Sequence, residues 1–106
     1  MTVTRDRGTV TVSLSGEIDH HSAPAMRKAA DDALFSGGVS VLVLDFSAVR
    51  FMDSSGVGLI LGRCKTAKDV GARVCVRGLS PRDKKIVKLA GLTSLCEIED
   101  ATEGAI

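Results

Sequence analysis

Hydrophobic and polar residues alternate at the start of the chain. Val10, Val12 and Leu14 are separated by polar residues, which is the pattern of a strand with one buried face. Val3 precedes them, and Arg5-Asp6-Arg7-Gly8 lies between the two segments. The chain is therefore predicted to open with a β-hairpin whose tight turn lies in residues 5–8.

A first helix is predicted from about Ser22 to Phe35. It follows a polar loop, residues 16–22, and Pro24 lies close to its start, where a missing N–H costs little. Gly37-Gly38 ends it. The residues at helical spacing that would form its apolar stripe are Met26, Ala29, Ala30, Ala33 and Leu34.

The next segment, residues 39–44, is a nearly continuous apolar run. Such a run is typical of a central strand covered on both faces, and the order strand, helix, strand favours parallel pairing. We expect this strand to end, and the chain to turn, before Asp53. A second helix then runs to about Lys68, predicted from the helical spacing of Val57, Ile60, Leu61 and Cys64.

In the last third of the chain, the pattern predicts a strand over residues 72–76, then a helix, and then a short strand within residues 92–98. Ser80-Pro81-Arg82-Asp83 combines a helix cap, a first-turn proline and a nearby acid. The predicted apolar face of this third helix is Ile86, Leu89 and Ala90. Residues 100–106 are expected to form a short helix or a frayed tail. The prediction is one α/β domain over residues 1–106, with a mixed sheet of about five strands and about four helices packed against it.

Composition and charge exclude several functions. The net charge is +1 and the three aromatic residues are all Phe, so neither a phosphate-backbone surface nor a base-stacking platform is expected. No apolar run reaches the length of a membrane span or the core of a signal peptide, and a cytoplasmic protein is predicted. The three cysteines, Cys64, Cys75 and Cys96, lack zinc or redox spacing and are expected to be reduced, mostly buried thiols.

The junction Asp53-Ser54-Ser55-Gly56 is the first candidate site. Aspartate and serine are favoured at a helix start because their side chains accept hydrogen bonds from the first backbone N–H groups. The same N–H groups and the positive helix end also form a site for an anion such as phosphate. A serine here is therefore either a cap or a switch, and both interpretations stay open.

Gly58 and Gly62 share one helix face with Ser54 because each is four residues from the last. A glycine inside a helix costs about 1 kcal/mol relative to alanine. Either the glycines let the helix pack closely on the sheet or on another helix, or they leave a smooth strip where the backbone of another protein can approach.

Catalytic and metal-binding interpretations find little support. His20 and His21 are adjacent, so in a strand they would point to opposite faces, and no matching ligand spacing completes a zinc site. The segment around Ser54 lacks the G-x-S-x-G elbow of a hydrolase, and the chain lacks a phosphate-binding G-x-x-x-x-G-K-[ST] loop. We predict no catalytic residue, no metal site and no cofactor. The basic residues of the third helix, Arg82, Lys84, Lys85 and Lys88, are expected to form a solvated face or to contact an acidic partner.

Two segments together carry a resemblance to a known family. Residues 16–21, Gly-Glu-Ile-Asp-His-His, and residues 51–63, Phe-Met-Asp-Ser-Ser-Gly-Val-Gly-Leu-Ile-Leu-Gly-Arg, resemble the STAS-domain anti-sigma factor antagonists, most closely those of the sporulation sigma-F system. The similarity extends to Ser80-Pro81 and Gly91-Leu92. The chain departs from the family at Cys64 and in a shorter segment after Asp100.

The resemblance implies a partner-switching protein. When unphosphorylated, such a protein binds an anti-sigma factor that is also a serine kinase, and so releases the sigma factor. Phosphorylation of the first serine of the D-S-[ST]-G motif, here Ser54, turns binding off, and a serine phosphatase restores it. ATP and magnesium would be bound by the partner. The residues that the resemblance and the helix pattern assign to the docking surface are Asp19, His20, His21, Asp53, Ser54, Ser55, Gly56, Gly58 and Gly62.

Two alternatives use the same residues differently. The first is a STAS-like accessory subunit of a membrane transport or stress-signalling assembly, in which the serine is not phosphorylated. The second is a small hydrolase with Ser54 as nucleophile and a histidine as base. The leading prediction involves neither a nucleic acid nor a membrane partner.

Overall fold

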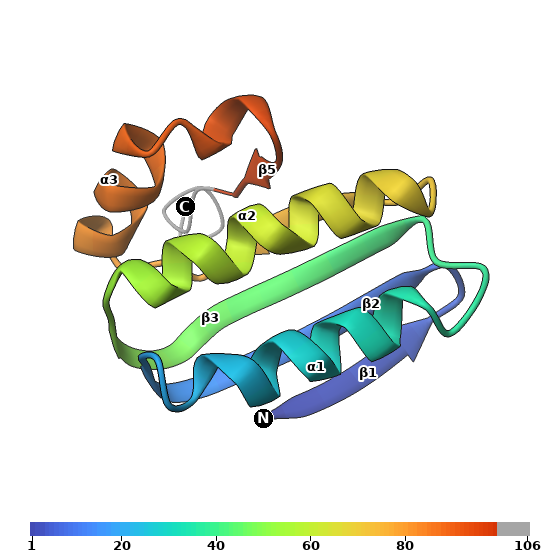
Figure 1. Ribbon diagram of the computed structural model, residues 1–106, viewed down its shortest axis with the longest axis horizontal. Coiled ribbons are helices and arrows are strands. Elements are labelled where there is room, and N and C mark those ends of the chain that lie inside the picture. Colours follow the sequence, from blue (N-terminus) through green and yellow to red (C-terminus); the bar gives the residue numbers. More distant parts are fainter. Residues whose placement is uncertain (100–106) are drawn as a thin grey trace, which may run out of the picture.

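The fold is a five-stranded mixed sheet with helices, seen in a computed structural model that describes residues 1–99 (Figure 1). The strands are β1 (Thr2–Asp6), β2 (Thr9–Ile18), β3 (Val41–Met52), β4 (Arg73–Arg77) and β5 (Glu97–Ile98). The helices are α1 (Ala23–Leu34), α2 (Ser54–Asp69) and α3 (Pro81–Leu89), followed by the 3-10 helix η1 (Leu92–Ser94). The predicted α/β class is confirmed. The fourth helix considered for residues 100–106 lies outside the described residues.

The strands lie in the sheet in chain order, β1-β2-β3-β4-β5. The β1–β2 pair is antiparallel, which confirms the opening hairpin, and the other three pairs are parallel. The hairpin turn is shorter than expected, because Arg5 pairs with Val10 and Asp6 pairs with Thr9. Only Arg7 and Gly8 remain in the turn, and Arg7 has a φ of 55°, as tight hairpins require.

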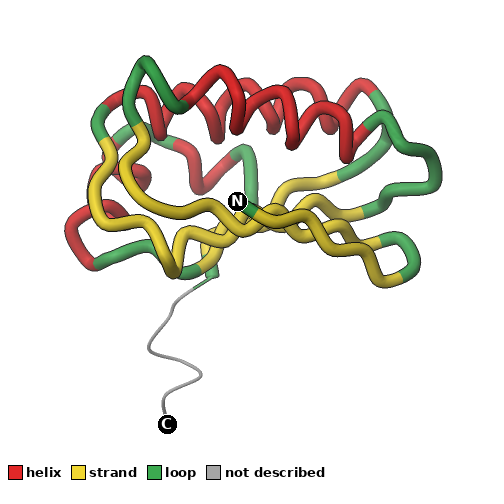
Figure 2. The backbone as a smooth tube through the Cα atoms, turned by 90° about the horizontal axis from the view of Figure 1, so that it is seen from below, coloured by secondary structure: helices red, strands yellow, loops and turns green. Residues whose placement is uncertain are grey.

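Both long helices cover the same side of the sheet (Figure 2). Leu42 and Leu44 of β3 point toward them and belong to the main hydrophobic cluster, whereas Val43 is buried outside that cluster. The expectation of a central strand covered on both faces agrees with the burial of Val43 as well as of Leu42 and Leu44, although α1 and α2 lie on one side only (Figure 2). An apolar run of alternating outward and inward residues does not by itself say which face a helix will occupy.

β2 and β3 are longer than the sequence indicated. We expected a polar loop from Gly16 and a turn before Asp53, but β2 continues to Ile18 and β3 to Met52. The two ends pair with each other, Ile18 opposite Met52, after register shifts between Ser13 and Ser15 and between Gly16 and Glu17. As a result, the segments after β2 and β3 begin side by side.

The helix bounds agree with prediction within a residue or two, but the buried faces of α2 and α3 differ from the predicted ones. The buried residues of α2 are Gly56, Leu59, Ile60, Arg63 and Ala67, so the face includes an arginine. In α3, Val87 is buried and Leu89 is 78% exposed, contrary to the expected face. Leu89 lies two positions after Val87, about 200° around the helix, so both cannot face the core of so short a helix.

Two predictions from composition bear on the described residues. Within residues 1–99 no helix is long and apolar enough to cross a membrane. All three cysteines are free as expected, with Cys75 buried and the other two half-buried.

Candidate functional site

The loop after β2 and the start of α2 meet at one edge of the sheet. The backbone N–H of Asp53 donates a hydrogen bond to the carbonyl of Ile18, at 3.1 Å. Because neighbouring parallel strands end at the same edge, the segment from Asp19 to Ser22 lies beside the first turn of α2. The structure thus brings together the two segments that carried the sequence resemblance.

Asp19 organises the loop before α1. Its Oδ1 accepts hydrogen bonds from the backbone N–H groups of His21 and Ser22, both at 2.9 Å. The Ser22 hydroxyl donates to the carbonyl of Glu17 at 2.7 Å and accepts from the N–H of Asp19. The bonds from Ser22 and then His21 lower the pKa of Asp19. The Asp19 carboxylate therefore holds the loop in shape rather than standing free.

His20 and His21 lie in a turn, not in a strand, and both are exposed. Their ring centroids are 4.0 Å apart, with the planes tilted by 38°. Their position in a turn agrees with the polar loop predicted for this segment, and the alternation of side chains in an extended backbone does not apply to them. In the described part of the chain, no group of three or more His, Cys, Asp or Glu residues is arranged to hold a metal ion.

Asp53 is the cap of α2. Its Oδ1 accepts a hydrogen bond from the N–H of Ser55 at 2.7 Å, and its backbone is extended. The expectation that at least one residue of the Asp53-Ser54-Ser55 junction caps the helix is confirmed. Ser54, the first residue of the helix, is exposed, and within residues 1–99 its hydroxyl makes no hydrogen bond. With the cap already supplied, the Ser54 hydroxyl is available for chemistry or contact.

The three glycines of α2 differ in their surroundings. A Cβ on Gly56 would lie 2.7 Å from Sδ of Met52, so close packing explains that glycine. A Cβ on Gly58 or Gly62 would meet nothing within 4 Å beyond the helix itself, among the described residues. Packing on the sheet or on another helix therefore does not explain Gly58 and Gly62. We call the face carrying Ser54, Gly58 and Gly62 the glycine strip.

A cleft of about 340 Å³ lies next to this strip, between the first turns of α1 and α2. The residues that line it are His20, Ala23, Pro24, Arg27, Ser55, Gly58, Leu59 and Arg63. Arg63 is 5% exposed, and its Nε lies 2.8 Å from Oδ1 of Asp31 on α1. Burial lowers the pKa of Arg63, Asp31 raises it, and the positive charge of Arg27 lowers it further.

Sequence reasoning did not assign a role to Arg27 or Arg63. Arg63 follows Gly56 by seven positions and Ile60 by three, and this spacing placed it on the buried stripe of α2. A charged residue at a buried helix position is a signal that could have marked it. Arg27 carried no such signal, because its place beside the cleft depends on how α1 packs against α2.

The basic helix α3 begins close to the end of β3. The guanidinium of Arg82 lies 5.7 Å from the centre of the Phe51 ring, a cation–π distance, and also forms an ion pair with Asp83 at 2.9 Å. Lys85 and Lys88 are exposed, in agreement with a solvated face.

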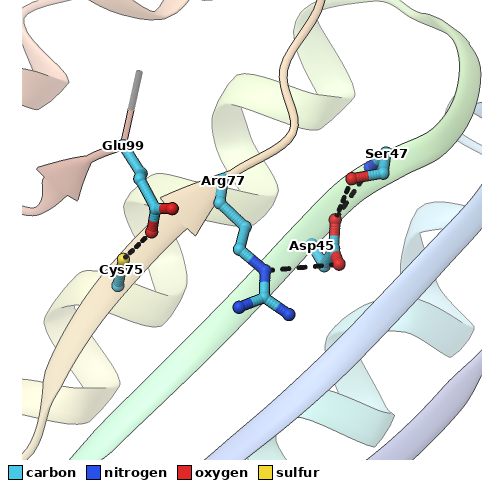
Figure 3. Close-up of polar contacts among 5 residues, drawn as sticks. All are labelled: Asp45, Ser47, Cys75, Arg77 and Glu99. Carbon is cyan, nitrogen blue, oxygen red and sulfur yellow. Dashed lines mark hydrogen bonds and ion pairs between the residues drawn. The ribbon is translucent and has the colours of Figure 1, made fainter. Parts of the chain in front are cut away.

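A separate polar cluster lies on the sheet face away from α1 and α2 (Figure 3). Oδ1 of Asp45 accepts hydrogen bonds from the N–H and hydroxyl of Ser47, at 2.9 and 2.6 Å, and its Oδ2 accepts one from Nε of Arg77 at 3.3 Å. Nearby, Sγ of Cys75 lies 3.8 Å from Oε2 of Glu99. Partial burial raises the pKa of Asp45, but the Ser47 hydrogen bonds and the Arg77 charge outweigh it, and the pKa is lowered.

Comparison with known proteins identifies the family. The model of the family described as STAS domain matches residues 1–105. The chain belongs to the STAS domain family. Its sequence is similar to an anti-sigma F factor antagonist of Lysinibacillus sphaericus, with 39% identity over 92% of this chain and 81% of that protein. A protein of the same name from Paenibacillus polymyxa is 35% identical over 94% of this chain and 86% of its own length.

The fold of this STAS domain is also similar to a solved structure of the anti-sigma factor antagonist SpoIIAA in its unphosphorylated form. The TM-score is 0.75 at 34% identity, covering 98% of this chain and 91% of that chain. A solved structure of SpoIIAA of Bacillus in the phosphorylated form is likewise a structural neighbour.

Proposed function

We propose that this STAS protein is an anti-sigma factor antagonist, which binds an anti-sigma factor and thereby releases a sigma factor. The observation that carries the proposal is the glycine strip. Gly58 and Gly62 weaken α2 by about 1 kcal/mol each, and no contact within the described chain requires them. A bare helix face beside an exposed serine suits a partner that must approach the backbone closely. The names of the similar proteins support the same function.

Ser54 is the proposed switch within this surface. Its hydroxyl is exposed and unengaged in the described chain, and Asp53 already caps the helix. A phosphate would add about −1.5 to −2 charges at neutral pH. The start of α2 tolerates that charge, so the fold survives, whereas a closely docked partner would have to desolvate it next to Asp53. Phosphorylation therefore abolishes binding without unfolding the domain.

The proposed partner is an anti-sigma factor that is itself a serine kinase and that binds the ATP and magnesium. A serine phosphatase returns the protein to its binding form. Asp19 and the two histidines border the docking surface, with Asp19 shaping the loop through its bonds to His21 and Ser22. In this assignment the protein is a substrate and a binding module, and none of its residues is catalytic.

Phosphosite mapping tests the proposal. The protein is mixed with the anti-sigma kinase encoded beside it and Mg-ATP, and the products are analysed by mass spectrometry. One phosphate on Ser54 is expected, with none on the Ser54→Ala variant, which should still bind the kinase. A phosphate on Ser55 instead would show that Ser55, not Ser54, is the phosphorylated residue. No phosphate from a kinase that is active on another substrate would contradict the proposal.

A second readout addresses the claim that the fold survives. NMR shift changes on phosphorylation should be confined to the first turns of α1 and α2 and to the loop carrying His20 and His21. Shift changes that spread to core residues such as Leu42 and Val76, which are fully buried, would show that the switch acts by refolding instead.

A further inference from the structure

The cleft between α1 and α2 is lined partly by basic side chains. Three of its lining residues are the basic residues His20, Arg27 and Arg63, and no acidic residue among residues 1–99 lines it. Its remaining walls come from Ala23, Pro24, Leu59, Gly58 and Ser55. A concave site lined by apolar and cationic side chains is suited to a single anionic side chain.

Arg63 is the second observation that points to an anion. Its side chain is 94% buried, since 6% is exposed, yet Nε and Nη1 have no hydrogen-bond partner within the described residues. The 2.8 Å contact of Nε with Asp31 is an ion pair whose N–H is not aimed at the oxygen. These two nitrogens have almost no solvent-accessible surface, so an anion in the cleft would not bond to them directly. The buried charge of Arg63 instead adds to the positive potential in the cleft.

Arg27 adds charge that nothing in the cleft neutralises. It is exposed, and its positive charge acts on Arg63 across the cleft. Asp31, the one acid paired with Arg63, does not line the cleft. Arg27 and the ion-paired Arg63 together therefore leave a net positive charge at a site that opens beside the glycine strip, where the partner is proposed to dock.

We propose that this cleft is an anion subsite that receives an aspartate or glutamate side chain of the anti-sigma factor. This inference rests on the proposed function and adds the chemistry of one contact within it. A carboxylate can take charge-assisted hydrogen bonds from a guanidinium in two-point geometry. The partner's side chain would enter between α1 and α2 while its backbone lies along Gly58.

Charge reversal at Arg27 tests the subsite. Arg27 is exposed, so the Arg27→Glu variant should fold, which thermal unfolding verifies. Calorimetric titration with the anti-sigma factor should show an affinity at least tenfold weaker than wild type, and Arg27→Ala should fall between the two. The matched control is Lys28→Glu, which makes the same charge change on a side chain that is 77% exposed, pairs with Asp32 and does not line the cleft.

Complementary changes in the anti-sigma factor identify the occupant. Each Asp or Glu of its docking face is changed to Arg and titrated against Arg27→Glu. One of these changes should restore the affinity at least tenfold. If none does, although Arg27→Glu alone binds weakly, a partner carboxylate is not the occupant, and competition by inorganic phosphate would then identify a phosphate site.

Two further results would overturn the subsite. One is Arg27→Glu binding within threefold of wild type, and the other is Lys28→Glu losing as much affinity as Arg27→Glu. In both cases wild-type protein still binds and is phosphorylated on Ser54, so the proposed function stands. Failure of the proposed function is distinct, because wild-type protein would then neither bind the anti-sigma factor nor accept phosphate.

Discussion

Two short Asp-x-Ser segments, one within β3 and one directly after it, make different use of the same residue types. In the first, Asp45 accepts two hydrogen bonds from Ser47 and one from Arg77. In the second, Asp53 accepts one hydrogen bond, from the N–H of Ser55, while the Ser54 hydroxyl has no partner in the described chain. The polar groups of the first segment bond to one another, whereas the second segment lies beside an unbonded hydroxyl, the glycine strip and the exposed Arg27.

The difference separates stabilising groups from recognition groups. Polar side chains that satisfy one another hold neighbouring strands in place, as Asp45 and Arg77 do between β3 and β4. Groups left without partners in the folded chain contribute little to its stability, and a second molecule can supply the missing contacts. Changes in the first region should therefore affect stability, and changes in the second should affect binding.

The largest effect is expected at Gly78, which packs against the Asp45 cluster. It has a φ of +77°, and a Cβ there would lie 2.6 Å from the backbone N of Ser47. Gly78→Ala should lower the free energy of unfolding by about 3 kcal/mol, from left-handed strain plus the clash. Gly16→Ala, with a φ of +78° and nothing within 4 Å, isolates the strain and should cost about 1 kcal/mol. Equal losses in urea unfolding would contradict the assigned clash.

Ser54→Asp should have the next largest effect, and on binding alone. A carboxylate at the docking surface must be desolvated, so affinity for the anti-sigma factor should fall by about 2 kcal/mol, roughly 30-fold. Thermal stability should stay within about 0.5 kcal/mol of wild type. Ser47→Ala should show the reverse, losing about 1 kcal/mol of stability with unchanged affinity. Wild-type affinity in Ser54→Asp would exclude the electrostatic switch.

Gly58→Ala should move stability and binding in opposite directions. The added methyl group meets open space in the free protein, so α2 should gain about 1 kcal/mol of stability from helix propensity. The same methyl group stands where the partner backbone is proposed to dock, so affinity should fall. Gly56→Ala is the contrast, because its clash with Met52 should destabilise the protein by about 1–3 kcal/mol. An unchanged affinity in Gly58→Ala would remove the argument for the glycine strip.

The smallest expected effect is the pH dependence of the stability that the Asp45 cluster contributes. The pKa of Asp45 is lowered in the folded state, so the unfolded chain binds a proton more readily. Its stabilising contribution is present above the pKa of an unfolded aspartate and is lost as pH falls through the folded value. The stability difference between wild type and Asp45→Asn, followed by urea unfolding, should therefore shrink on acidification. If this stability difference instead grew toward low pH, the pKa of Asp45 would be raised, not lowered, in the folded state.

Short-range sequence patterns were sufficient to predict much of the fold. Ser80 caps α3 by accepting from the N–H of Asp83, as its sequence indicated, because capping involves residues three positions apart. The hairpin and the helix positions were likewise predictable from short-range patterns. The exposed Leu89 and the stacked His20 and His21 were not, since which side of a short element faces the core depends on its neighbours.

The sequence by itself determined the order of the elements, a helix cap within Asp53-Ser54-Ser55 and the family resemblance around Ser54, because each depends on residues close together in the chain. The tertiary structure decided what surrounds those residues. It lengthened β2 and β3 until Ile18 and Met52 pair, and it left Gly58 and Gly62 facing open space while Gly56 packs on Met52. It also buried Arg63 against Asp31 beside a cationic cleft. These features depend on distances between segments far apart in the chain, which a local pattern does not contain.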